Sequence, residues 1–363
     1  MPASTSKKID WNHILENLQR ITLPQKIFFV DSLRVMIKAG LSVVEALRIL
    51  ALQTPNPRFK KIIEAIKKNV EEGHSLTETL EKFPSVFPPI FVKMISAGEI
   101  SGRLEDTLQQ IVIQMKKSYE LSSKVRGAMI YPAVVLVAML GIGVEMVVFV
   151  LPKLLAVFKE MNIALPIPTR ILIALSDFLI NHGILALISI GACVGALIAI
   201  HKKLWFQKFW HMAIIHFPII GNIVKQVNLA RFTLTLSSLL KSTIPIIDAL
   251  DITGQVLGNV HYKLIVKETS EQIKSGRTLA ECLTPYPLFF PPLTTQMILV
   301  GEQSGKLEEM LSELAAYYDN EVDRILKNIS TIIEPLMIII LGVVVGALAV
   351  SVIMPLYSLA EGF

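Results

Sequence analysis

The feature that most constrains the fold of this chain is an internal repeat. Residues 29–152 align with residues 232–355 at a constant offset of 203 positions and without a gap. FPSVFPPI at residues 83–90 matches YPLFFPPL at 286–293, and GEISGRLEDTL at 98–108 matches GEQSGKLEEML at 301–311. Self-similarity over this length predicts that one folding unit occurs twice.

Each repeat unit ends in an apolar stretch, and a further apolar stretch lies between the two units. The chain is 52% hydrophobic, too apolar for an ordinary soluble protein, yet its 18% of charged residues requires water-exposed domains. The runs 127–144, 178–200 and 335–360 carry no acidic or basic side chain other than His182, and each is long enough to cross ~30 Å of hydrocarbon as a helix. We therefore predict transmembrane helices at residues 127–151, 171–200 and 329–357.

Basic residues set the orientation of these helices. Lysine and arginine gather before the first span, after the second and before the third, which is typical of the cytoplasmic side. A polar N-terminal segment (1–24) and two helical domains (25–126 and 201–328) are thus expected in the cytoplasm, and a loop (152–170) and the C-terminus (358–363) outside. Residues 1–24 contain no apolar core of a signal peptide, so the N-terminus is expected in the cytoplasm.

The signals within each unit are helical. SVVE at 42–45, SLTE at 75–78 and TLAE at 278–281 have capping-box spacing, and Gly73 and Gly276 end the preceding helices. Apolar residues recur every three or four positions, with no sustained alternation. The prediction is an all-α membrane protein with two repeated cytoplasmic helical-bundle domains of about six helices each, and three transmembrane helices.

No catalytic constellation is found in the sequence, and no cofactor is predicted. GEQSGK at 301–306 resembles a phosphate loop, but it is one residue short and Leu307 stands where serine or threonine would hold magnesium. A helix–turn–helix connection suits this segment and its counterpart at 98–104 better. The net charge of +5 is explained by the cytoplasmic basic residues of a membrane protein, so no nucleic acid partner is predicted.

Several acidic residues are candidates for a functional site. Paired positions in the two repeats are candidates for a divalent-cation site or a docking surface, against the alternative of a solvated turn and cap: Glu99, Glu105, Glu302 and Glu308. Glu145 lies inside the first span, where a carboxylate costs ~2.5–3.5 kcal/mol. It is interpreted either as a contact to a polar group of a partner helix or as a snorkelling or dimer-interface residue.

Two other patterns concern contacts of the membrane part. GACVG at 191–195 and GVVVG at 342–346 have the small-xxx-small spacing that favours close helix packing, within one chain or between copies. Trp205, Phe206, Phe209 and Trp210 follow the second span, and either anchor a helix at the membrane interface or are buried in the next domain.

The assembled motifs resemble the inner-membrane platform protein family of type II secretion systems and type IV pili, the GspF/PilC family. The resemblance rests on MIYP at 129–132, LPIPT at 165–169, FPIIG at 217–221 with ARF at 230–232, VGEQSGKL at 300–307 and IEP at 333–335. The residues that carry the family motifs here are Gly98, Glu99, Ser101, Gly102, Tyr131, Pro132, Gly301, Glu302, Ser304, Gly305, Glu334, Pro335 and Pro355. One departure is Thr243, which replaces the glycine expected by analogy with Gly40, so that turn is expected to differ.

The resemblance implies a multi-pass protein of the bacterial inner membrane that is not an enzyme. Its expected partners are a cytoplasmic assembly ATPase, pilin or pseudopilin subunits, other inner-membrane assembly proteins, the lipid bilayer and further copies of itself. The platform would couple the ATPase to insertion of pilin-like subunits into a filament. The alternative is a membrane transporter or channel built from repeats, for which Glu145 is the only intramembrane carboxylate within an uncharged run.

Overall fold

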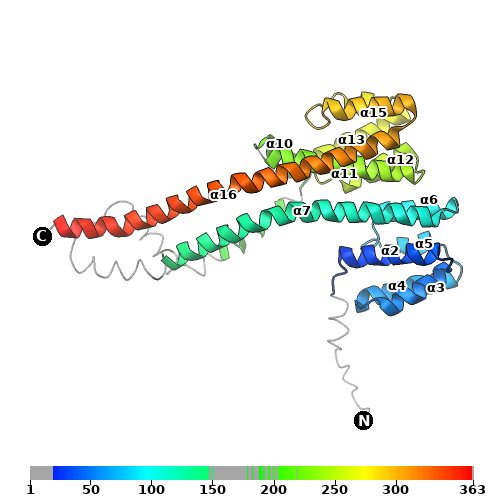
Figure 1. Cartoon of the computed structure of the whole chain (residues 1–363), viewed down its shortest axis with the longest axis horizontal. Helices are drawn as coiled ribbons and strands as arrows, with labels where there is room; N and C mark the ends of the chain where they lie inside the picture. The colour runs from blue at the N-terminus through cyan, green and yellow to red at the C-terminus, as the bar shows by residue number, and fades with distance from the viewer. Residues whose placement is uncertain are drawn as a thin grey trace, which may run out of the picture. The chain divides into compact units, whose positions relative to one another are not determined.

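The computed structural model describes residues 19–146, 203–218 and 220–361, with isolated positions between 149 and 200. The side chains of residues 329–334 and of several later residues lie outside this description. Throughout the described ranges the regular structure is helical and no strand occurs, so the prediction of an all-α protein is confirmed (Figure 1).

The two repeats form matching series of helices. In the first repeat these are α2 (Leu23–Lys38), α3 (Val43–Gln53), α4 (Pro57–Glu71), α5 (Leu76–Glu81), α6 (Pro89–Ile100) and α7 (Leu104–Glu145). After α10 (Leu204–His216), the second repeat has α11 (Ile220–Lys241), α12 (Ile246–Val256), α13 (Val260–Lys274), α14 (Leu279–Leu283), α15 (Pro292–Ser304) and α16 (Leu307–Glu361). The described residues therefore supply the six helices per repeat that the sequence predicts.

The chain divides into two compact units. The bundle unit comprises Met1–Ser122 and Val224–Glu321, and the span unit comprises Ser123–Ile223 and Val322–Phe363. Both halves of the duplication contribute to the bundle unit, in which helices α2 to α6 and α12 to α15 lie entirely. Helices α7 and α16 begin in the bundle unit and continue into the span unit.

Helix ends in the bundle unit follow the capping signals. Ser42 Oγ accepts a hydrogen bond from Glu45 N (3.2 Å) and Ser75 Oγ from Glu78 N (3.0 Å). At Thr278 the box is complete, because Glu281 Oε2 also accepts from Thr278 N. Gly73 and Gly276 have φ values of 95° and 90° after α4 and α13, a backbone conformation that glycine adopts without steric cost.

Three aromatic rings form the centre of each half of the core. Phe29, Phe59 and Phe87 come from α2, α4 and the segment before α6, and their centroids lie 5.4, 5.7 and 6.4 Å apart. The second repeat has Phe232, Tyr262 and Phe290 at the corresponding positions, with Phe290 5.1 Å from Phe232 and 5.5 Å from Tyr262. Burial of the Tyr262 ring requires a partner for its hydroxyl, which donates to Phe289 O at 2.9 Å.

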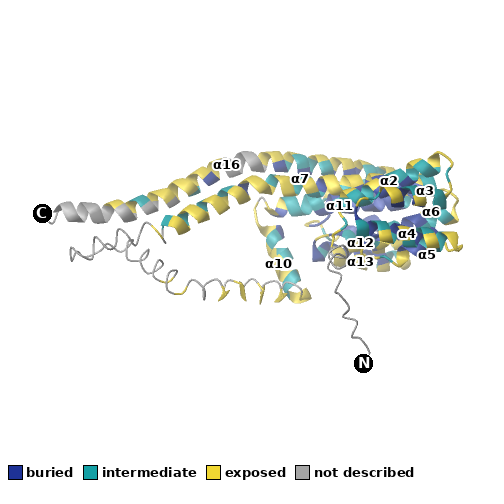
Figure 2. Ribbon diagram, turned by 90° about the horizontal axis from the view of Figure 1, so that it is seen from below, coloured by how far each residue is buried: buried dark blue, intermediate teal, exposed yellow. Residues whose placement is uncertain are grey.

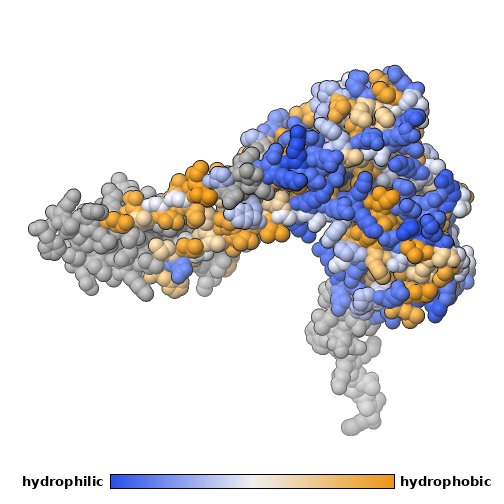
Figure 3. All heavy atoms as spheres, in the orientation of Figure 1, coloured by the Kyte–Doolittle hydropathy of each residue, from blue (hydrophilic) through white to orange (hydrophobic). Residues whose placement is uncertain are grey.

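One described helix is long and apolar enough by itself to cross a membrane, namely α7. Its apolar half is exposed, as is the corresponding part of α16 around Ile338 and Val343 (Figures 2 and 3). Helices α10 and α11 pass the same test only when taken together, and α11 is a core helix because Phe232, Leu236 and Leu239 are buried. The predicted span at 171–200 and the loop at 152–170 lie outside the described residues apart from isolated positions, so the number of spans stays a prediction.

Aromatic side chains of α10 are exposed in the structure. Trp205, Phe209 and Trp210 all face outward, while Phe206 stacks on Trp210 with ring centroids 6.2 Å apart. Of the two interpretations of this segment, this exposure favours a helix at the membrane interface over burial in the second domain.

The turn after α11 keeps the conformation of its counterpart despite the change of residue. Gly40 follows α2 with φ 87°, and Thr243 follows α11 with φ 60°. The expected difference between the two turns is thus not found, because the bond from Ile244 N to Leu239 O (3.2 Å) repeats that from Leu41 N to Met36 O (3.0 Å). A β-branched residue at positive φ costs ~1–3 kcal/mol.

We expect Thr243→Gly to raise the melting temperature of the full-length protein in detergent, followed by circular dichroism at 222 nm. Glycine removes the steric strain of the left-handed backbone conformation at this position. This gain in folded-state stability exceeds the ~0.4–1 kcal/mol lost because glycine makes the unfolded chain more flexible. The matched change Gly40→Ala, where φ is 87° and a Cβ would meet no atom within 4 Å, should lower the melting temperature for the same reason. A Thr243→Gly protein that melts below the parent would contradict this.

Candidate functional site

The GE-SG motif of each repeat forms a tight connection between two helices, here called the joint (residues 98–104 and 301–307). Arg103 N donates to Gly98 O at 2.8 Å, and Lys306 N donates to Gly301 O at the same distance. Gly102 and Gly305 have φ values of 69° and 71°, as a left-handed helix C-cap requires. The segment that resembles a phosphate loop in sequence is therefore a helix–turn–helix connection in both repeats.

The first glycine of the joint allows two helices to touch. A Cβ built on Gly98 would lie 2.5 Å from Thr107 Oγ1 of α7, and one built on Gly301 would lie 2.9 Å from Leu307 Cα of α16. Both distances are shorter than any side-chain contact allows. Only glycine therefore permits this approach of α6 to α7 and of α15 to α16.

The glutamate of the joint caps a neighbouring helix. Glu99 Oε1 accepts from Leu76 N at 2.8 Å, and Glu99 Oε2 accepts from Thr77 N at 2.9 Å and from the Thr77 hydroxyl. In the second repeat, Glu302 accepts from Leu279 N (2.6 Å) and Ala280 N (3.0 Å). These N–H groups start α5 and α14, where a helix leaves its donors without partners, so each carboxylate ties the short helix to the joint.

The serine of the joint hydrogen bonds within its own helix. Ser101 Oγ donates to Ala97 O and Ser304 Oγ to Val300 O, both at 2.7 Å. Of the further acidic candidates, Glu105 lies 3.4 Å from Lys38 Nζ, and Glu308 is exposed. Over the described ranges, no group of three or more histidine, cysteine, aspartate or glutamate residues is placed to hold a metal ion. Glu99 and Glu302 therefore act as helix caps, which is the second of the two interpretations given to them from the sequence.

Contacts between the repeats form a buried polar seam that the sequence did not reveal. Gln114 of α7 donates from Nε2 to Thr235 Oγ1 at 2.9 Å and accepts at Oε1 from Ser238 Oγ at 3.2 Å. All three side chains are buried. Because a buried amide without partners is costly, this pairing fixes the register of α7 against α11.

A polar cavity of about 260 Å³ lies where the first joint meets the end of α11. Its lining includes Arg103, Asp106, Gln110, Lys241 and Thr243. Arg103 is already paired with Asp106 at 2.9 Å, and Lys241 Nζ donates to Ser312 Oγ at 3.4 Å. The cavity is thus lined by the Arg103–Asp106 ion pair and by the Lys241 ammonium group, which is hydrogen bonded to a neutral hydroxyl.

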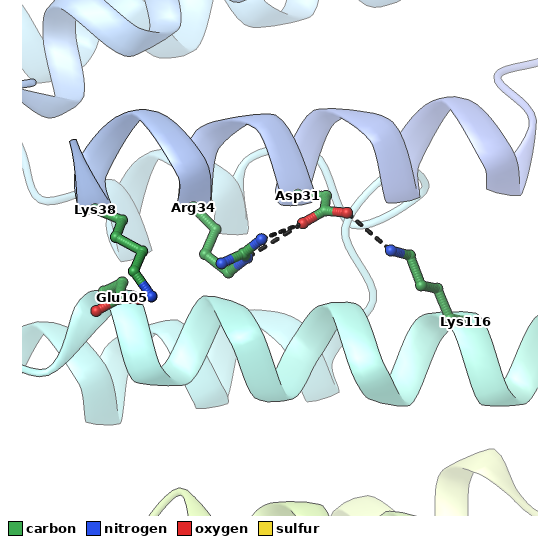
Figure 4. A network of polar contacts seen from close by, with 5 residues as sticks. All are labelled: Asp31, Arg34, Lys38, Glu105 and Lys116. Carbon is green, nitrogen blue, oxygen red and sulfur yellow. Dashed lines mark hydrogen bonds and ion pairs between the residues drawn. The ribbon is translucent and has the colours of Figure 1, made fainter.

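On its other side α7 is held to α2 by an ionic network (Figure 4). Asp31 accepts from Lys116 Nζ at 2.8 Å and from Arg34 Nη2 at 2.9 Å, and Lys38 lies 3.4 Å from Glu105. The hydrogen bond from Lys116, with a smaller contribution from Arg34, holds the pKa of Asp31 below its usual value. Helix α7 therefore contacts α2 of its own repeat and α11 of the other.

The other predicted residues lie in the span unit. Tyr131 is exposed and Pro132 is buried, both inside α7, and Pro335 is exposed in α16. Glu145 ends α7 and is exposed. Glu334 and Pro355 belong to α16, but their side chains lie outside the described residues. These residues thus belong to a different unit from the joints.

The described residues define a duplicated, all-α protein in which one described helix is long and apolar enough to cross a membrane and in which the repeated joint connects and caps helices. A family model described as "Type II secretion system (T2SS), protein F" matches residues 29–152 and again 232–355, together more than half of the chain. The chain belongs to this family.

Curated relatives cover nearly the whole chain. It is 34% identical over 334 residues to the type IV pilus assembly protein PilC of Myxococcus xanthus, spanning 92% of this chain and 80% of the relative. It is 33% identical over 342 residues to PilC of Thermus thermophilus, spanning 91% and 81%. It is 32% identical over 330 residues to the type II secretion system protein F of Pseudomonas aeruginosa, again spanning 91% and 81%.

We expect Gly98→Ala to destabilise the bundle by ~1–3 kcal/mol, because the new methyl group overlaps Thr107 and α6 must move away from α7. The measurement is the melting temperature of the full-length protein in detergent. Gly254→Ala in α12 is the matched control, since its Cβ would lie 3.7 Å from Val266 Cγ1, an ordinary contact. The control should be neutral or stabilising by ~0.5–1 kcal/mol, and equal melting of the two variants would refute the close approach.

We expect Asp31→Asn to lower stability at pH 7 by ~1 kcal/mol or less, since the pair with Lys116 is partly exposed. A carboxylate whose pKa is lowered in the folded state contributes stability above its unfolded pKa of ~3.9 and loses it as pH falls through the folded pKa. The difference in melting temperature between parent and variant should therefore begin to shrink below about pH 4 and vanish as the pH falls through the lowered pKa of the folded protein. Glu64→Gln, at an exposed position of α4, is the control, and a gap that widens in acid would contradict the assignment.

Proposed function

We propose that this chain is the inner-membrane platform of a type IV pilus or a type II secretion pseudopilus, and that it couples a cytoplasmic assembly ATPase to insertion of pilin-like subunits into the filament. The observation that carries the proposal is the duplicated family unit, since each copy places a helical bundle on a helix that continues into an apolar stretch. The relatives named for type IV pilus assembly and for type II secretion support both versions of the apparatus.

The chemistry of the joints supports a platform whose energy comes from a partner. A phosphate loop binds through free backbone N–H groups. In the first joint, Gly102 N donates a hydrogen bond to Glu99 O at 3.2 Å, and Arg103 N donates one to Gly98 O at 2.8 Å. In the second joint, Gly305 N donates to Glu302 O at 3.4 Å, and Lys306 N donates to Gly301 O at 2.8 Å. With these donors used inside the chain, ATP hydrolysis is assigned to the ATPase.

The arrangement in the membrane that we propose has three spans, with both bundles and the N-terminus in the cytoplasm. Lys124 Nζ of α7 binds Asp323 Oδ2 of α16 at 2.9 Å, on the N-terminal side of the apolar stretch of each helix. The contact precedes both apolar stretches, which are therefore expected to enter the membrane from the same side. Since α7 then crosses to the far side, the chain needs a return crossing before α11, for which we propose the predicted span at residues 171–200.

The test is to cross-link the tagged protein in intact cells, dissolve the membrane gently and identify the proteins recovered with it by mass spectrometry. Recovery of an assembly ATPase together with a pilin-like subunit is the expected result. Recovery should persist with Gly254→Ala and fall with Gly98→Ala, because only the second change disturbs the bundle. If the parent protein brings down neither partner, and a solute-linked or enzymatic partner instead, the platform proposal fails.

A further inference from the structure

The seam between the two repeats is built from non-equivalent surfaces. The first repeat contributes α7 through Gln114, and the second contributes α11 through Thr235 and Ser238. Because the repeats share one fold, each surface has a counterpart: α16 corresponds to α7, and α2 corresponds to α11. When two similar units pack head to tail, one surface of each takes part in the contact and the other does not. Here α7 and α11 form the contact between the repeats, and their counterparts α16 and α2 are left without it.

The unused counterparts are exposed. At the offset of 203 residues, Gln114 corresponds to Tyr317 of α16 and Ser238 corresponds to Val35 of α2. Gln114 and Ser238 are each 4% exposed, whereas Tyr317 is 44% and Val35 51% exposed. Equivalent positions of the two repeats are thus buried where they form the seam and exposed to solvent on α2 and α16.

The face of α2 that holds Val35 is suited to a protein contact. Phe28, Ser32 and Val35 are spaced by four and three residues, so they lie on one side of the helix, and Phe28 is also exposed. The ionic contacts to α7 are made by another side of the helix, through Asp31, Arg34 and Lys38. Helix α11, in contrast, is buried almost all round from Asn228 to Leu239.

The unused surfaces are less polar than the seam. Where the seam joins Gln114 to Thr235 and Ser238, the exposed pair would place the Tyr317 ring beside Val35, with Ser32 in reach of the tyrosine hydroxyl. Tyrosine supplies a large apolar contact with a hydroxyl at its end and is enriched at interfaces. The contact can therefore form without burying an unpaired charge at these three positions.

We propose that α2 of one copy of this chain packs on α16 of a second copy in the way that α11 packs on α7 within the chain (Figure 1). The resulting contact is heterologous, so each copy offers both surfaces and a closed ring or an extended row forms according to the rotation between neighbours. In this arrangement the helices follow the order α2, α7, α11, α16 and then α2 of the next copy.

The test uses two differently tagged copies in one cell, one with Val35→Cys and the other with Tyr317→Cys, both carrying Cys193→Ala. Cys282 is retained because it is 2% exposed, and burial raises the pKa of its thiol, so it reacts slowly. Mild oxidation should give a disulfide-linked species with both tags, at least tenfold above a control that pairs Tyr317→Cys with Glu64→Cys of α4. A yield no higher than this control overturns the proposal, as does a link between two Val35→Cys copies that equals the mixed link.

Opposite charges introduced at the two positions provide a second test of the contact. Because Val35 and Tyr317 are exposed, Val35→Lys and Tyr317→Asp should each reduce the oligomer fraction in native mass spectrometry while leaving the melting temperature unchanged. Combining the two changes in one chain should restore the oligomer, and an oligomer fraction unaffected by either single change overturns the contact. The contact between copies is measured without any partner protein, so its failure leaves the platform function untouched.

Discussion

The contact of α6 with α7 at Gly98, repeated by α15 and α16 at Gly301, is the constraint on which the rest of the bundle unit depends. It fixes the direction in which each long helix leaves the joint, because no side chain fits between the helices. The adjacent glutamate then ties a third helix to the same place through two backbone N–H groups. A seven-residue segment thus orients three helices, and α7 so placed reaches α2 on one side and α11 on the other.

Much of this architecture could be predicted from the sequence because its signals are local or repeated. Capping at Ser42 and Thr278 and the glycine at Gly73 depend on neighbouring residues alone, and the offset of 203 residues determines how the helices correspond. The turn at Thr243 was predicted wrongly, because tertiary packing holds a threonine in a conformation that its own preference disfavours. The assumption that a duplication preserves the backbone conformation would have predicted this turn correctly.

The candidate site was predicted less completely. The sequence drew attention to Glu99 and Glu302, but their partners lie 22 or 23 residues away in another helix, and no local pattern shows which donors meet a carboxylate. The seam at Gln114 left no trace in the sequence either. A glutamine within an amphipathic helix is usually exposed, and only the three-dimensional position of α11 turns it into a buried residue.

The asymmetry of burial between α2 and α11 has a consequence for the history of the duplication. Asp31 and Arg34 of α2 correspond to Leu234 and Ser237 of α11, both of which are buried. A chain with two identical halves would place that aspartate and that arginine at buried positions of α11, where a charge is costly without a partner. The two halves have therefore become specialised and are no longer interchangeable, and a substitution tolerated in one half is no guide to its tolerance in the other.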